Sequence, residues 1–233
     1  MEKRAFDIGG IPALLWGPTS ERLILAVHGS GSHKADVPIR LLAEDAVPKG
    51  YQILSFDLPR HGARAQDPTP CKVQPCVEEL TAVLAYIRPR WPRRSVFGNS
   101  LGAYFSLLAC RDEPLQQALF LSPVVDMRRL IENMMGWAGV TPERLQAEGE
   151  IATDFGETLD WSYYCYVCRH PVDRWQTPTD ILYGGRDALC EGEVVRAFAQ
   201  RFGCGLETVP WAEHYFHTPR ELDALRAWFA QKL

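Results

Sequence analysis

The sequence lacks a long hydrophobic run, an excess of basic residues and a cysteine pattern typical of disulfide-rich proteins. Its best apolar run, Leu23 to Val27, has five residues, whereas a membrane-spanning helix needs about 20. No hydrophobic segment follows the charged start of the chain, so we expect no signal peptide. With 25 basic and 29 acidic residues, the chain also lacks the clustered positive charge that binds nucleic acid.

Seven cysteines are an odd number, and they are scattered over 233 residues, enough to form a core without disulfides. We therefore expect reduced thiols and a cytoplasmic location. Cys71 with Cys76, and Cys165 with Cys168, could together bind zinc, but neither spacing is diagnostic of a zinc site. The prediction is free thiols, no metal and no cofactor.

Short β-rich runs alternate with helical patterns, which predicts an α/β fold with a mostly parallel sheet and helices on both faces. The predicted strands are Ala5–Ile8 and Ala13–Trp16 (an N-terminal hairpin), Arg22–Val27, Tyr51–Phe56, Ser95–Phe97, Ala118–Leu121, Ile181–Tyr183 and Leu206–Val209. The predicted helices are Pro38–Pro48, Cys76–Ile87, Leu101–Cys110, Val194–Phe202 and Arg220–Leu233. We expect a single domain over residues 1–233.

The alternation stops between Val124 and Thr177, where 54 residues look helical or irregular and no strand is evident. Such an insertion (residues 124–177) predicts a small helical cap or lid rather than a separate domain. Its methionines and aromatic residues could line an apolar pocket, although ordinary packing accounts for them equally well. These residues are Met127, Met134, Met135 and the run 161–166.

The most informative motif is Gly98-Asn99-Ser100-Leu101-Gly102, which directly follows one predicted strand and directly precedes a predicted helix. In that setting, G-x-S-x-G forms a sharp turn that exposes the serine above the sheet, and the glycines remove side chains that would clash. A strand before the motif and a helix after it make this match far more specific than a chance occurrence of G-x-S-x-G. We therefore predict that Ser100 is a nucleophile.

A serine nucleophile needs a base that is itself held by an acid. Where such a turn is used, the chain order is serine, acid, histidine, each after a strand. Asp187 and His214 follow the last two predicted strands and fit this order. Asp126 is the alternative acid and His217 the alternative base. The histidines that precede Ser100 do not fit and are interpreted as structural: His28, His33 and His61.

The reaction also needs N–H donors for a developing oxyanion. We expect one from Leu101 and the other from Ser30, in the glycine-rich loop after the strand Arg22–Val27, with Gly31 a near-equal candidate. The same loop could cradle a phosphate. It lacks, however, the G-K-[ST] ending of a P-loop and the third glycine of a dinucleotide-binding motif.

Several segments resemble the α/β-hydrolase family over essentially the full chain: LILAVHGSGS, FDLPRHG, VFGNSLGAY, LFLSP, ILYGGRD and AEHYF. The resemblance implies the α/β-hydrolase fold and a triad of Ser100, Asp187 and His214. It also implies a structural role for the FDLPRHG turn, which contains Asp57, His61 and Gly62. One departure is Asn99, where many members have histidine before the serine.

The leading interpretation is a serine hydrolase that cleaves a small-molecule carboxylic ester. Thioester, lactone, acyl-transfer or small-peptide chemistry of the same fold stays open, and so does a noncatalytic ligand-binding role. The sequence does not determine the oligomeric state.

Overall fold

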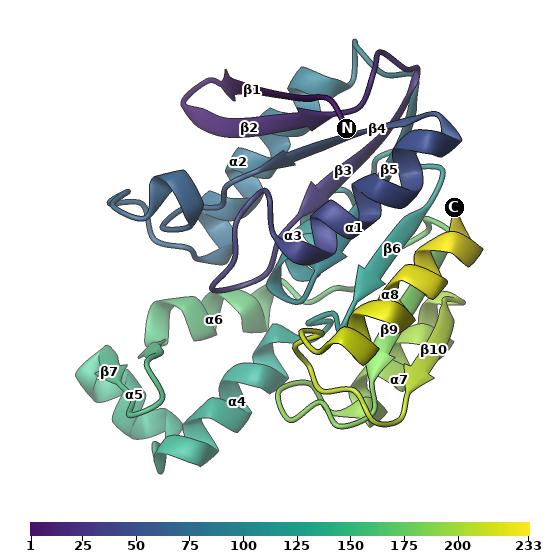
Figure 1. Cartoon of the computed structure of the whole chain (residues 1–233). Coiled ribbons are helices and arrows are strands. Elements are labelled where there is room, and N and C mark those ends of the chain that lie inside the picture. The colour runs from purple at the N-terminus through teal and green to yellow at the C-terminus, as the bar shows by residue number, and fades with distance from the viewer.

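An eight-stranded sheet organises the backbone in the computed structural model, which describes residues 1–233 (Figure 1). Its strand order is β1-β2-β4-β3-β5-β6-β9-β10. The strands are β1 (Lys3–Ile8), β2 (Ile11–Trp16), β3 (Arg22–Val27), β4 (Tyr51–Phe56), β5 (Arg93–Asn99), β6 (Ala118–Leu121), β9 (Thr179–Gly184) and β10 (Gly205–Val209). The β1–β2 hairpin and the β2–β4 pair are antiparallel, and all other neighbours are parallel. The predicted fold class is confirmed.

Helices cover both faces of the sheet (Figure 1). One face packs against α1 (Val37–Ala46) and α8 (Pro219–Lys232), and the other against α2 (Val73–Ile87), α3 (Leu101–Ala109) and α7 (Gly192–Phe202). Two short 3-10 helices are Val47–Lys49 and Gly62–Arg64. No helix combines the length and the apolar character needed to cross a membrane.

Strand β3 shows why the sheet is buried on both sides. Successive side chains of a strand point to opposite faces. Leu23, Leu25 and Val27 therefore join the larger core, of 43 buried residues, while Ile24 and Ala26 join the smaller core of 19. A strand that is apolar at every position fits this central place in a parallel sheet.

The insertion between β6 and β9 contains α4 (Met127–Ala138), α5 (Pro142–Glu148), β7 (Glu150–Ala152), β8 (Thr158–Asp160) and α6 (Trp161–Arg169). Strands β7 and β8 form a small antiparallel hairpin, so the prediction that this region contains no strand is wrong. Each strand has only three residues, too few for an alternating pattern to show in the sequence. In Figure 1 the insertion projects beyond the carboxyl end of β6.

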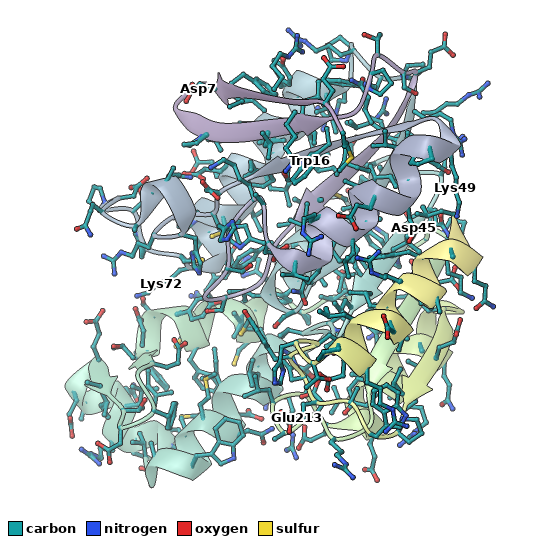
Figure 2. The ribbon with its side chains drawn as sticks, viewed as in Figure 1. Asp7, Trp16, Asp45, Lys49, Lys72 and Glu213 are labelled. Atoms are coloured by element: carbon teal, nitrogen blue, oxygen red, sulfur yellow. The ribbon has the colours of Figure 1, made fainter.

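The insertion is attached to the rest of the molecule by packing and by charge. Its buried residues, such as Leu130, Leu145 and Leu159, belong to the same 43-residue core as one face of the sheet. At the start of α2, Lys72 pairs with Asp160 and lies 3.8 Å from Glu150 (Nζ to Oε1). Figure 2 shows Lys72 at this junction.

Candidate active site

Ser100 occupies the turn between β5 and α3 in a strained conformation, with φ +49° and ψ −113°. Three backbone hydrogen bonds hold it there. Its N–H donates to the Leu121 carbonyl (2.9 Å), and its carbonyl accepts from Ala103 N–H (3.1 Å) and Val124 N–H (3.2 Å). The residues at the end of β6 therefore clamp the serine from both sides.

The two glycines of the motif are required by close backbone contacts. A Cβ on Gly98 would lie 2.6 Å from Ala103 Cα, and one on Gly102 would lie 2.3 Å from the Val27 carbonyl oxygen. Either approach is too close for real atoms. The turn therefore forms only with glycine at both positions, as the motif predicts.

The structure brings the predicted serine, acid and histidine together from the loops after β5, β9 and β10. Ser100 Oγ lies 2.8 Å from His214 Nε2, and His214 Nδ1 lies 2.6 Å from Asp187 Oδ2. Because a carboxylate only accepts, Nδ1 donates to Asp187 and Nε2 is left to accept from the serine hydroxyl. The Asp187 side chain is fully buried, and that of His214 is 11% exposed.

Backbone groups fix the acid and its loop. Asp187 Oδ1 accepts from the N–H groups of Leu189 (2.8 Å) and Cys190 (2.9 Å). Arg186 N–H donates to the Ala212 carbonyl (2.8 Å), which ties the acid loop to the loop that carries His214. The carboxylate is thus positioned before any ligand binds.

Glu221 was not singled out by the sequence analysis, yet it orders the histidine loop. Its nearly buried carboxylate accepts from the N–H groups of Glu213 (3.0 Å), His217 (3.1 Å) and Thr218 (2.9 Å). Burial alone raises a carboxyl pKa, but these hydrogen bonds reverse the effect and lower the pKa of Glu221 to about 2. Thr218-Pro219-Arg220-Glu221 forms a capping box, and that T-x-x-E signal was available in the sequence.

Leu101 and the loop that contains Ser30, the two residues predicted to bind an oxyanion, adjoin Ser100. Leu101 is the first residue of α3, where an N–H has no acceptor within the helix. The loop after β3 also approaches closely, since a Cβ on Gly29 would lie 3.2 Å from Ser100 Cβ. In this loop Gly31 N–H donates to His61 Nε2 (3.0 Å), whereas Ser30 N–H has no hydrogen-bond partner. This difference favours Ser30 over Gly31.

The alternative acid and base lie outside this hydrogen-bonded chain. Asp126 caps α4 by accepting from Arg129 N–H (3.0 Å), and His217 Nδ1 donates to the Tyr215 carbonyl (2.6 Å). His217 does, however, line the adjoining cavity.

The remaining residues of the family resemblance have structural contacts. Burial lowers the pKa of His28 to about 4, and its neutral Nε2 accepts from Leu58 N–H (3.0 Å). Buried Asp57 accepts from the N–H groups of Lys34 (2.8 Å) and Ala63 (2.9 Å). A Cβ on Gly62 would lie 2.3 Å from Asp57 Oδ1, so this turn requires glycine.

One group of side chains has the composition of a metal site: the ligand atoms of Asp187, Cys190 and His214 lie within 4.8 Å of one another. The carboxylate and the imidazole, however, are already hydrogen-bonded to each other. Burial also raises the pKa of the Cys190 thiol, which disfavours the thiolate that a metal needs. The donor set fits a hydrogen-bonded triad better than a metal. The four cysteines considered for zinc form no such cluster.

A cavity of about 400 Å³ opens beside Ser100 and His214. Its walls come mainly from residues 29–38, which run from the loop after β3 into α1, and from residues 214–222, which run from the loop after β10 into α8. Its apolar lining consists of Ala35, Val37, Pro38, Leu121, Leu189, Phe216 and Leu222. No residue of the insertion lines it. Met127 and Met135 are instead buried in the larger core, so ordinary packing explains them.

The sequence matches the model of the Alpha/beta hydrolase family over residues 24–230. The chain belongs to this family. The match agrees with the sheet topology and confirms the resemblance identified from the motifs. No curated protein sequence matches the chain.

Several solved structures share the fold of this chain. Est1E from Butyrivibrio proteoclasticus, with bound ferulic acid, is 22% identical with a TM-score of 0.78, covering 98% of this chain and 96% of that one. Alpha/beta hydrolase domain-containing protein 10 from mouse is 15% identical with a TM-score of 0.78, covering 99% and 98%. The Pyrococcus furiosus esterase Pf2001 is 17% identical with a TM-score of 0.70, covering 99% and 89%. At these identities the likeness shows the fold alone.

Proposed function

We propose that the protein is a serine hydrolase of carboxylic esters, with Ser100 as nucleophile, His214 as base and Asp187 as orienting acid. The observation that carries the proposal is the hydrogen-bonded chain from Ser100 Oγ to His214 (2.8 Å) and on to Asp187 (2.6 Å), at the wall of a cavity. Membership of the Alpha/beta hydrolase family and esterases among the structural neighbours support a hydrolase.

In the first half of the reaction, Ser100 Oγ attacks the ester carbonyl carbon while His214 Nε2 takes the hydroxyl proton. Asp187 keeps the imidazole in the tautomer that accepts at Nε2 and stabilises the imidazolium that forms. The N–H groups of Leu101 and Ser30 bind the oxyanion. His214 then delivers the proton to the leaving alcohol, and an acyl group stays on Ser100.

In the second half, His214 removes a proton from water, which attacks the acyl carbonyl carbon. The tetrahedral intermediate collapses, the acid product leaves and Ser100 regains its proton. These steps use only groups of the chain, so the proposal includes no metal and no cofactor. Hydrolysis is expected to fall at acid pH, because a general base must be unprotonated to accept the serine proton.

The cavity indicates the kind of substrate. A volume of about 400 Å³ with mainly apolar walls suits a small acyl or aromatic ester. Est1E was solved with ferulic acid, so the substrate panel should include methyl ferulate beside p-nitrophenyl esters from acetate to long-chain acyl groups. Thioesters, lactones and amides belong in the same panel, because the triad does not distinguish their leaving groups.

The decisive experiment compares the wild type with Ser100→Ala on this panel. We expect Ser100→Ala to lose turnover by orders of magnitude with an unchanged fold by circular dichroism. Ser106→Ala is the matched control, since Ser106 lies in α3, donates to the Gly102 carbonyl and does not line the cavity. Wild-type turnover in Ser100→Ala would overturn the assignment. Ligand binding without covalent labelling of Ser100 would favour a noncatalytic role.

A further inference from the structure

Two thiols face each other at the start of α2, outside the candidate active site. Cys71 precedes the N-cap residue Lys72, and Cys76 lies within the helix. Their Sγ atoms are 3.7 Å apart. Cys76 is fully buried whereas Cys71 is partly exposed, so Cys71 is the more accessible residue of the pair.

The surroundings of the pair favour a thiolate on Cys71. The hydrogen bond from the Cys76 thiol is the largest influence and lowers the pKa of Cys71 against the opposing effect of burial. The N-terminus of α2 also favours negative charge. The pKa of Cys76 is raised by the same hydrogen bond and by burial, so Cys76 keeps its proton.

The other five cysteines lack this combination. Burial raises the pKa of the thiols of Cys110 and Cys190, and raises that of Cys204 to about 11. Cys165 and Cys168 lie on α6 and have no sulfur-to-sulfur hydrogen bond. The chain therefore contains one pair with a reactive sulfur directly opposite a second thiol.

We propose that Cys71 and Cys76 form an oxidisable dithiol that closes to a disulfide when a hydroperoxide reaches Cys71. The Cys71 thiolate attacks the peroxide oxygen, the O–O bond breaks, and Cys71 becomes a sulfenic acid while the released alkoxide or hydroxide takes a proton from solvent. The Cys76 sulfur then attacks the sulfenic sulfur. An S–S bond forms, and the Cys76 proton leaves with the hydroxyl group as water. Two electrons pass in total from the two thiols to the peroxide.

The test treats the reduced chain, residues 1–233, with about one equivalent of hydrogen peroxide, followed by N-ethylmaleimide and trypsin. Lys72 lies between the two cysteines, so trypsin separates them into peptides 65–72 and 73–90, which stay linked only if the disulfide has formed. We expect this linked pair as the main product. The mass of the intact oxidised chain should be lower by two hydrogens before labelling. It should then take up two fewer N-ethylmaleimide groups than the untreated chain.

Two variants keep the result interpretable. Cys76→Ser, which keeps a hydrogen-bond donor beside Cys71 but cannot form the disulfide, should stop the reaction at sulfenic acid on Cys71, which dimedone traps. The double variant Cys165→Ser/Cys168→Ser should still yield the linked peptides. The proposal is overturned if wild-type Cys71 reacts no faster than Cys165, or if the disulfides formed are a random mixture. Both readouts follow thiols rather than ester hydrolysis, so they stand apart from the proposed function.

Discussion

At the residue scale, Ser100 keeps its strained backbone because its neighbours leave no other arrangement. Three backbone hydrogen bonds hold it, Gly98 allows β5 and α3 to approach, and Gly102 allows α3 to approach the end of β3. Strain of this kind persists only where the surrounding structure over-determines it, and it is concentrated at functional sites.

A pair of glycine variants tests this arrangement. In Gly102→Ala the added Cβ would meet the carbonyl oxygens of Val27 (2.3 Å) and His28 (2.4 Å), so we expect a loss of about 1–3 kcal/mol in unfolding free energy. Gly136→Ala, in α4, has open space around the new Cβ and should gain up to about 1 kcal/mol from helix propensity. Urea unfolding measures both. Equal effects of the two changes would contradict the role given to Gly102.

The sequence predicted Ser100, Asp187 and His214 because each comes within a few residues of the end of a strand, and the carboxyl ends of parallel strands lie at one edge of a sheet. It did not separate Ser30 from Gly31, because that choice depends on His61, a residue 30 positions away that takes the Gly31 N–H. The sequence also left open whether the insertion lines the pocket, for the same kind of reason. Which loops surround a serine is decided by three-dimensional packing, not by local pattern.

At the scale of elements, the predicted boundaries differ where polar residues or proline obscure the pattern. Strand β5 begins at Arg93 rather than Ser95, because Arg93 and Arg94 pair with β3 although neither looks like a strand residue. Helix α2 begins at Val73 rather than Cys76. Pro75 lies in its first turn, where a missing N–H costs no intrahelical bond.

The N-terminus of α8 provides a prediction about pH. Glu221 has a folded-state pKa of about 2 against an ordinary value of 4.5. Because its folded pKa is depressed, its contribution to stability is fully present above about pH 4.5 and is lost as the pH falls towards 2. Glu221→Gln should therefore be less stable than the wild type at pH 7, with a gap that narrows between pH 4.5 and 2. Urea midpoints across this range measure the gap, and a gap independent of pH would count against the assignment.

The attachment of the insertion provides a second prediction. Lys72→Met leaves the nearly buried Asp160 without its cation, which should destabilise the fold by about 1–3 kcal/mol and speed amide hydrogen exchange in residues 150–169. Lys49→Met is the matched control, since Lys49 contacts the Ala230 carbonyl on the far side of the molecule (Figure 2). Exchange in the insertion that is the same in both variants would argue that packing alone holds it.

At the scale of the whole molecule, the insertion and the sheet share one hydrophobic core. We therefore propose that residues 1–233 unfold as a single domain, as the sequence analysis predicted. Thermal unfolding can be followed by far-ultraviolet circular dichroism and by tryptophan fluorescence, to which Trp137 and Trp161 of the insertion and Trp16 of the sheet all contribute. The two transitions should coincide, because both parts lose the same core at once. Two separated transitions would show that the insertion is a domain of its own.

The direction of α8 has a practical consequence. Its first turn forms the capping box beside the histidine loop, and its 14 residues carry the chain about 21 Å away before Leu233. Leu222, near the start of α8, lines the cavity, and the C-terminus lies at the other end of this helix (Figure 1). A protein immobilised on a bead through Leu233 should therefore keep its cavity open to the surrounding liquid.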